Sequence, residues 1–152
     1  MRSTPVHSES QRTYEWLWIV FTLSSLALLL TWGTKLPAPG RYFMVGALMF
    51  VGVFLWGFLE LRVTITATEL TFGFPFWRKR LVLSEVTVGD VVPISWWHGI
   101  GIHRARSGWV FNARYGRAVE VFAHGVRYLI GSNAPEQLQA ALLRAAPRRP
   151  TL

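Results

Sequence analysis

The chain has 152 residues and no cysteine, and its Lys and Arg outnumber Asp and Glu by 16 to 8, which gives a formal charge of +8 at neutral pH. The lack of cysteine excludes disulfides, thiolate nucleophiles, iron–sulfur clusters and cysteine-based zinc sites. The positive charge favours an anionic partner. We expect phospholipid headgroups and no nucleic acid, because no nucleic-acid-reading motif accompanies the charge.

The first predicted element is a pair of membrane-spanning helices. An uncharged apolar run covers residues 16–34 and a second covers 42–59, each about as long as the hydrocarbon core of a bilayer requires. Prolines between them predict a tight turn, and aromatic residues near the ends of both runs are typical of a membrane interface. A cleaved signal peptide is the alternative for the first run, but that run is bulky where a cleavage site needs small residues. We assign residues 1–14 to an N-terminal tail and 15–60 to a transmembrane hairpin.

The distribution of basic residues predicts the orientation of the hairpin. Basic residues beside membrane spans are in excess on the cytoplasmic side. Those on the side of the two termini outnumber those in the connecting turn: Arg2, Arg12, Arg62 and the cluster of residues 78–80 stand against Lys35 and Arg41. We therefore expect a multi-pass protein of the cytoplasmic (inner) membrane with both termini in the cytoplasm.

Two glycines of the second span, Gly46 and Gly57, fall on one face of the predicted helix. Small residues on a helix face allow a second helix to approach closely. We interpret this face as the contact within the hairpin, with dimerisation as the alternative.

A compact β-rich domain is predicted for residues 61–146. Alternating apolar and polar side chains predict strands over 61–67 and 70–74, and residues 81–92 suit one bent strand or two. Residues 75–79 break the pattern. The segment opened by Pro93 is expected to be a long loop or an irregular edge.

The last part of this domain contains a turn signal and a helix signal. Strand composition resumes at 109–111, 118–123 and 126–130, and the pair His124-Gly125 suits a two-residue hairpin turn. Asn133 and Glu136 resemble a capping box with Pro135 in the first turn. An apolar stripe then predicts an amphipathic helix: Leu138, Ala141, Leu142 and Ala145. Residues 147–152 form a basic C-terminal tail.

Six or seven antiparallel strands followed by one helix predict an α+β membrane protein whose domain is a curled sheet, a sandwich or a small open barrel. The segments RVTITATELTF, RLVLSEVTVGDVV, HGIGIHR, GRAVEVFAHGVRYLI and APEQLQAAL, placed after a hairpin, resemble the bacterial pleckstrin-homology-like (PH-like) small membrane proteins over residues 15–145. HGIGIHR looks like the aromatic-Gly-x-Gly-Ile-Arg element of that family, but His98 takes the aromatic position and His103 precedes the arginine. The resemblance implies a PH-like barrel or sandwich and no defined activity.

No arrangement of residues indicates catalysis. Acid/base chemistry needs two carboxylates, or a histidine with an orienting partner, within reach of one another, and the acidic residues are scattered through separate predicted elements. His98, His103 and His124 would be the donors of a metal site, but neither helical nor strand spacing puts the first two on one side. The glycines of residues 99–104 lack the third glycine of a dinucleotide fingerprint. We expect a protein that is not an enzyme, with no catalytic residue, cofactor or metal.

Two groups of residues are candidate binding surfaces. The first combines aromatic and basic side chains that suit the boundary between acyl chains and headgroups: Trp77, Arg78, Lys79 and Arg80, at the expected tip of an early hairpin. The second is the loop with adjacent tryptophans: Trp96, Trp97, His98, Arg104 and Arg106. A plainer interpretation of the first group is that its basic residues only set the orientation of the spans. A plainer interpretation of the second group is a contact between the domain and its own hairpin.

These features predict a non-catalytic membrane module whose PH-like domain recruits a protein partner or senses anionic phospholipid. A structural subunit of a larger membrane complex is the second hypothesis. An enzyme that uses the His98 and His103 loop is the third.

Overall fold

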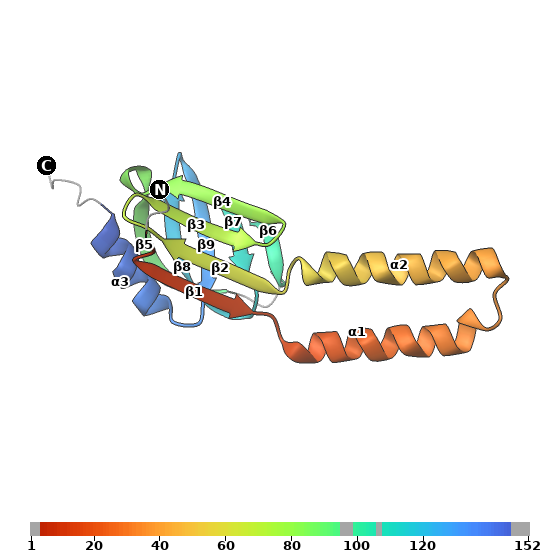
Figure 1. Cartoon of the computed structure of the whole chain (residues 1–152). Helices are drawn as coiled ribbons and strands as arrows, with labels where there is room; N and C mark the ends of the chain where they lie inside the picture. The colour runs from red at the N-terminus through yellow and green to blue at the C-terminus, as the bar shows by residue number, and fades with distance from the viewer. Residues whose placement is uncertain (1–3, 95–98, 106–107, 147–152) are drawn as a thin grey trace, which may run out of the picture.

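The computed structural model describes residues 4–94, 99–105 and 108–146. A helical hairpin is joined at one end to a domain of two sheets and a C-terminal helix (Figure 1). The helices are α1 (Glu15–Leu28), which continues into a π-helical turn (Leu29–Gly33), α2 (Ala38–Trp56) and α3 (Pro135–Ala145). The strands are β1 (His7–Arg12), β2 (Glu60–Ile65), β3 (Glu69–Phe74), β4 (Trp77–Val82), β5 (Thr87–Ile94), β6 (Gly101–Ala105), β7 (Gly108–Asn112), β8 (Gly116–Ala123) and β9 (Val126–Ser132).

The two helical segments of the hairpin are long and apolar enough to cross a membrane. Each has 19 residues, which at a rise of about 1.5 Å per residue spans about 28 Å. Neither α1 nor α2 buries a side chain within the chain. The second helix begins before the predicted span, because Pro37 precedes it in extended conformation and Pro39 lies in its first turn. For this reason the helix includes Arg41. Its last residue is Trp56.

The hairpin is inserted between two neighbouring strands of one sheet. β1 pairs with β2 in antiparallel register, from His7 opposite Ile65 to Arg12 opposite Glu60. Residues 7–12, which the sequence pattern assigns to a tail, thus form part of the domain. The strand HSESQR has no apolar residue to reveal its alternation, because its three more buried positions are His7, Glu9 and Gln11.

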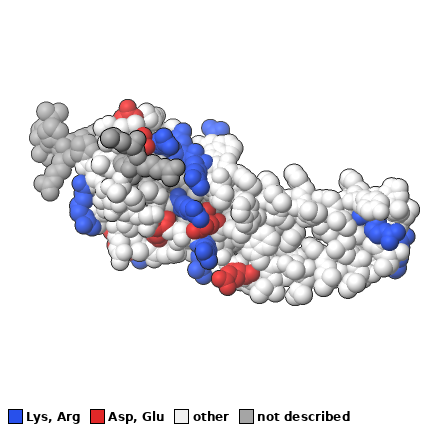
Figure 2. Space-filling view, in the orientation of Figure 1, with Lys and Arg blue, Asp and Glu red and all other residues white. Residues whose placement is uncertain are grey.

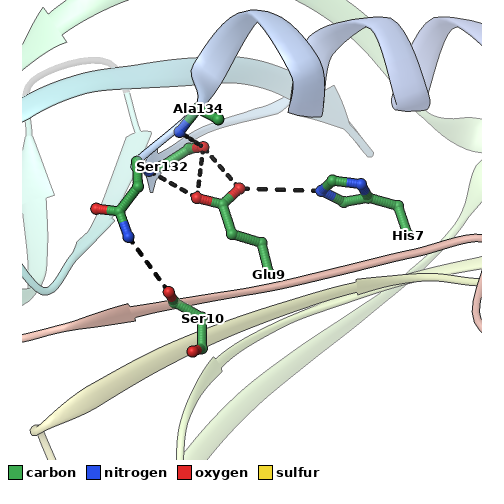
Figure 3. Close-up of polar contacts among 6 residues, drawn as sticks. His7, Glu9, Ser10, Ser132 and Ala134 are labelled. Atoms are coloured by element: carbon green, nitrogen blue, oxygen red, sulfur yellow. Dashed lines mark hydrogen bonds and ion pairs between the residues drawn. The ribbon is translucent and has the colours of Figure 1, made fainter.

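Polar contacts tie β1 to the end of the domain. The Glu9 carboxylate accepts hydrogen bonds from the Ser132 hydroxyl and from the Asn133 backbone N–H, the latter at 2.6 Å (Figure 3). His7 lies beside the same carboxylate at 3.9 Å. The side chain of Gln11, which is 3 % exposed, accepts a hydrogen bond from the Ala113 backbone N–H at 3.0 Å.

The nine strands form two sheets rather than a closed barrel. The first has the order β1-β2-β3-β4 and is antiparallel throughout. The second has the order β5-β8-β9-β7-β6, and in it β7 pairs with β9 in parallel. The expectation of a purely antiparallel domain is therefore wrong for this one pair of strands. β7 and β9 lie side by side and run in the same direction, although β8 lies between them along the chain.

Two strands occupy segments where the sequence predicts irregular structure. β4 begins at Trp77, within the expected break at residues 75–79. β6 lies within the segment after Pro93 that was expected to be a long loop or an irregular edge, and it forms an edge strand of the second sheet. The segment 81–92 divides into the end of β4, a 3₁₀ turn (Leu83–Glu85) and most of β5. The chain of β4 is basic and exposed, and β6, with the sequence GIHRA, is short and mixed in polarity, so neither shows a clear apolar alternation.

The core lies between the two sheets and continues under α3. Phe72 of the first sheet meets Phe111 and Tyr128 of the second, with ring centroids 4.9 and 5.6 Å apart. Leu138 and Leu142 of α3 are fully buried, which confirms the predicted apolar stripe. The turn at His124-Gly125 is also confirmed, and both residues have the positive φ (53° and 74°) that a two-residue hairpin turn favours.

The expected capping box at the start of α3 is absent. The residue before the helix is Ala134, and no side chain caps it. The Asn133 side chain donates to the Ser10 carbonyl instead, and Glu136 pairs with Arg117. Pro135 does occupy the first turn, as predicted.

Candidate functional site at the base of the hairpin

The two connections between the hairpin and the domain are bonded to each other. The Thr13 backbone N–H donates to the Leu59 carbonyl at 2.7 Å, and the Thr13 hydroxyl donates to the Phe58 carbonyl at 3.1 Å. We call Thr13, Phe58 and Leu59 the seam. It fixes the start of α1 beside the end of α2, so that pockets at the base of the hairpin have walls from both helices.

A basic pocket of about 530 Å³ borders this seam. Its lining combines cations, carboxylates and aromatic rings: Arg12, Thr13, Glu15, Trp18, Trp56, Leu59, Glu60, Arg62, Pro75 and Arg78. Lys and Arg side chains form a band across the domain near the helices, whereas the shaft of the hairpin is uncharged up to its far end (Figure 2). The pocket thus lies where the charged domain meets the apolar helices.

Strand register brings the arginines of the basic pocket together. Arg62 on β2 and Arg78 on β4 both pair with Gly73 on the strand between them, so they lie on one face of the sheet. Gly73 has φ of 142°, and a Cβ there would lie 2.2 Å from the Trp77 carbonyl oxygen. Glycine is therefore required for β4 to approach β3 here. Arg12 comes from β1, opposite Glu60.

One ion pair lies within the basic pocket. Arg62 donates to the Glu60 carboxylate at 2.9 Å. This hydrogen bond lowers the pKa of Glu60, assisted by the Ser10 hydroxyl and by the charges of Arg62 and Arg12, while burial opposes the change. The same bond raises the pKa of Arg62.

Two arginines of the pocket remain available to an anion. Among the residues that the structure describes, no carboxylate lies within salt-bridge distance of Arg12 or Arg78. Glu15 lies in the first turn of α1, where a negative charge stabilises the helix N-terminus. The pocket thus offers two unpaired guanidinium groups and a third shared with Glu60.

The structure divides the first predicted surface between two places. Residues 77–80 lie in strand β4 rather than at a tip, which consists of Pro75 and Phe76. Arg78 lines the basic pocket. Trp77 and Lys79 instead line a small cleft of about 130 Å³ with aromatic residues of the second sheet, where the Lys79 ammonium lies 5.9 Å from the Tyr128 ring centroid. Arg80 pairs with Glu69 at 3.5 Å.

The second predicted surface falls largely outside the described residues. Trp96, Trp97, His98 and Arg106 are among the residues whose placement is not described. Arg104 is exposed on β6, an edge strand of the second sheet. Within residues 4–94, 99–105 and 108–146, no cluster of three metal-binding side chains occurs, and His124 lies 3.2 Å from Glu85 instead.

The glycines predicted to pack within the hairpin lie elsewhere. A side chain at Gly46 would meet no atom within 4 Å, and one at Gly57 would meet the ring of Phe76. Gly33 and Gly52 are the positions that face the opposite helix, near Met44 and Phe21 respectively. Gly46 lies within α2 and Gly57 follows its end, and their spacing in the sequence does not say which face of a helix meets the partner helix.

Sequence reasoning did not assign Arg12 and Arg62 to the site. Both appear in the sequence only as basic residues that flank the spans. Their meeting with Arg78 depends on β1 joining the sheet and on the register of β2 against β3. No apolar alternation in HSESQR marks the strand that carries Arg12, so the sequence gives no local signal for it.

No protein-family model matches this chain, and neither a curated protein nor a solved structure matches it. The fold is therefore assigned from the structure of the chain itself, which has two apolar helices, two packed sheets and a C-terminal helix.

Proposed function

We propose that this protein is an integral membrane protein whose domain binds anionic phospholipid headgroups in the basic pocket at the base of its hairpin. In this proposal the hairpin crosses the membrane and the domain, with both termini, lies on the cytoplasmic side. The role is one of binding rather than catalysis. The PH-like resemblance of residues 15–145 is part of the same proposal, as are the inner-membrane location and the bacterial origin that it implies.

Support for the membrane location comes from the surface of the hairpin. Many of its large side chains are exposed, with Tyr42 at 77 %, Phe43 at 80 % and Phe50 at 72 %. A contiguous apolar surface of this kind is unfavourable in water and favourable in hydrocarbon. Trp18 and Trp56 lie at the end of the hairpin next to the domain, where membrane proteins place aromatic side chains at the headgroup level.

The observation that carries the proposal is the position of Arg12, Arg62 and Arg78 beside Trp18 and Trp56 in one pocket. A guanidinium group binds phosphate oxygens through two parallel hydrogen bonds. Each basic residue close to an acidic leaflet contributes about 1 kcal/mol. Because the tryptophans mark the interface and the arginines face outward from the sheet beside them, the pocket suits a phosphate at headgroup depth.

The experiment is a competition between two lipids for the full-length protein. The purified chain is incubated in detergent with equal amounts of phosphatidylglycerol and phosphatidylcholine, and native mass spectrometry measures which lipid is bound. We expect the wild type to prefer phosphatidylglycerol and Arg78→Gln to reduce that preference. Arg144→Gln on α3 is the control, since it removes the same charge at an exposed position outside the pocket. Equal preference in the two variants would overturn the proposal.

A further inference from the structure

A second cavity, of about 370 Å³, also borders the seam. It shares Thr13, Trp18 and Leu59 with the basic pocket, but its other lining residues are different. Leu17 and Phe21 come from α1, and Phe54 and Leu55 of α2, Phe58 after its end and residues 100–103 complete it. The basic pocket opens toward the first sheet, whereas this cavity lies against the second.

The chemistry of this lining is apolar. Thr13, Trp18 and His103 carry its polar side-chain groups, and the Thr13 hydroxyl already donates to the Phe58 carbonyl. A buried water molecule needs about two to four polar partners, so water is poorly held in a space of this size. An empty space is also unfavourable, because the atoms that line it lose their dispersion contacts. A hydrocarbon ligand needs no polar partners and restores the dispersion contacts, so it suits this cavity better than water or an empty space.

The two helices that line the cavity have exposed, apolar flanks. On α1, Ile19 and Leu23 are each 60 % exposed, and on α2 Val53 is 58 % exposed. From the domain, the buried Gly101 (φ 115°) lines the cavity, and a Cβ added there would lie 3.7 Å from Phe58. A chain that enters from the side of the hairpin therefore ends against the domain.

We propose that this cavity binds one acyl chain of a membrane phospholipid between the hairpin and the domain. The proposal rests on the membrane location proposed above, but it does not depend on the arginines of the basic pocket. The bound chain contacts residues 100–103. Lipids that only surround the hairpin contact its outer flanks instead.

The test uses the full-length protein in nanodiscs of phosphatidylcholine that contain a phosphatidylcholine with a photoactivatable diazirine near the end of one acyl chain. After illumination, peptide mass spectrometry maps the labelled residues. We expect label on residues 100–103 as well as on the outer flanks of the helices. Leu17→Trp and, independently, Leu55→Trp fill the cavity and should abolish the label on 100–103, because both positions line it. Leu23→Trp is the matched control on α1 outside the lining.

Each other outcome is decisive. Label on the helix flanks but none on residues 100–103, or equal label there in both filled variants and the wild type, would overturn the acyl-chain site and leave the headgroup proposal intact. Absence of label on the helices as well would overturn the membrane location, and with it both proposals. Arg78→Gln should leave the label on 100–103 unchanged. If that variant abolishes it, the lipid is held by its headgroup and the separate chain site is wrong.

Discussion

The backbone N–H of Thr13 donates to the carbonyl of Leu59 at 2.7 Å, and this pair extends the β1–β2 register by one position beyond Arg12 and Glu60. The hairpin begins and ends at this hydrogen-bonded pair. Such a pair is also the position that flanks a tight two-residue turn in an ordinary β-hairpin. The helical hairpin therefore occupies the place of a short loop in the domain.

Replacing residues 14–58 by Asn-Gly should give a soluble, folded domain. The dipeptide favours the positive φ angles of a turn between antiparallel strands, and it joins Thr13 to Leu59 without a change of register. Circular dichroism and a cooperative unfolding transition would show this.

Deleting residues 1–59 is the informative control. It removes the hairpin and also β1, with the Gln11 side chain that accepts from Ala113 and the Glu9 carboxylate that accepts from Ser132. We expect this chain to aggregate or to lack a cooperative transition. If it folds as well as the chain with the Asn-Gly turn, β1 is not an integral part of the domain.

Glu9 and Ser132 should be energetically coupled. The Ser132 hydroxyl lies 2.9 and 2.7 Å from the two carboxylate oxygens of Glu9 (Figure 3). A hydrogen bond to a charged group contributes about 1.5–3 kcal/mol, so Glu9→Ala and Ser132→Ala should each lower the free energy of unfolding by roughly 1–3 kcal/mol. In urea unfolding of the Asn-Gly domain, the double variant should lose clearly less than the sum of the two. Additive losses would show that the pair does not interact in solution.

The apolar elements of this fold can be predicted from the sequence because burial leaves a periodic pattern. The two helices, the strands around Val63, Phe72 and Ile130 and the stripe of α3 all show it. The turn at His124-Gly125 is predictable for a second reason, since its backbone conformation restricts the residues that fit.

The polar elements cannot be predicted in the same way. β1 is held by hydrogen bonds to partners more than 100 residues away, such as Gln11 to Ala113, and no local pattern encodes them. β4 is exposed and basic along most of its length. Because the basic pocket depends on both strands, only Arg78 of its three arginines was predicted as a binding residue.

Gly57→Leu should be more destabilising than Gly46→Leu. A Cβ at position 57 would lie 1.9 Å from a ring carbon of Phe76, which also contacts Trp56 at a centroid distance of 6.1 Å, whereas position 46 is open. Overpacking of this kind costs about 1–3 kcal/mol. The melting temperature of the full-length protein in detergent should therefore fall only for Gly57→Leu. The added change Phe76→Ala should restore part of the loss, and a lack of rescue would contradict the contact.

The Glu60–Arg62 pair should make a pH-dependent contribution to stability. The folded-state pKa of Glu60 lies below its ordinary value of 4.5. A lowered carboxyl pKa stabilises the folded state above the ordinary value, and this contribution disappears as the pH falls through the folded-state pKa. The difference in urea midpoint between the Asn-Gly domain and its Glu60→Gln variant should be constant above pH 4.5 and vanish in acid. A difference that grows on acidification would contradict the assignment.

The most direct test of headgroup binding is flotation with vesicles of the Asn-Gly domain, which keeps Arg12, Arg62 and Arg78 of the basic pocket but lacks Trp18 and Trp56. We predict binding to vesicles that contain phosphatidylglycerol, weaker binding at higher salt, and little binding to pure phosphatidylcholine. The double variant Arg62→Gln/Arg78→Gln should reduce the binding constant by roughly tenfold or more, at about 1 kcal/mol for each arginine. Arg144→Gln should leave it close to the wild-type value. Equal binding to both kinds of vesicle, or a double variant that binds as the unchanged Asn-Gly domain does, would contradict headgroup recognition by these arginines.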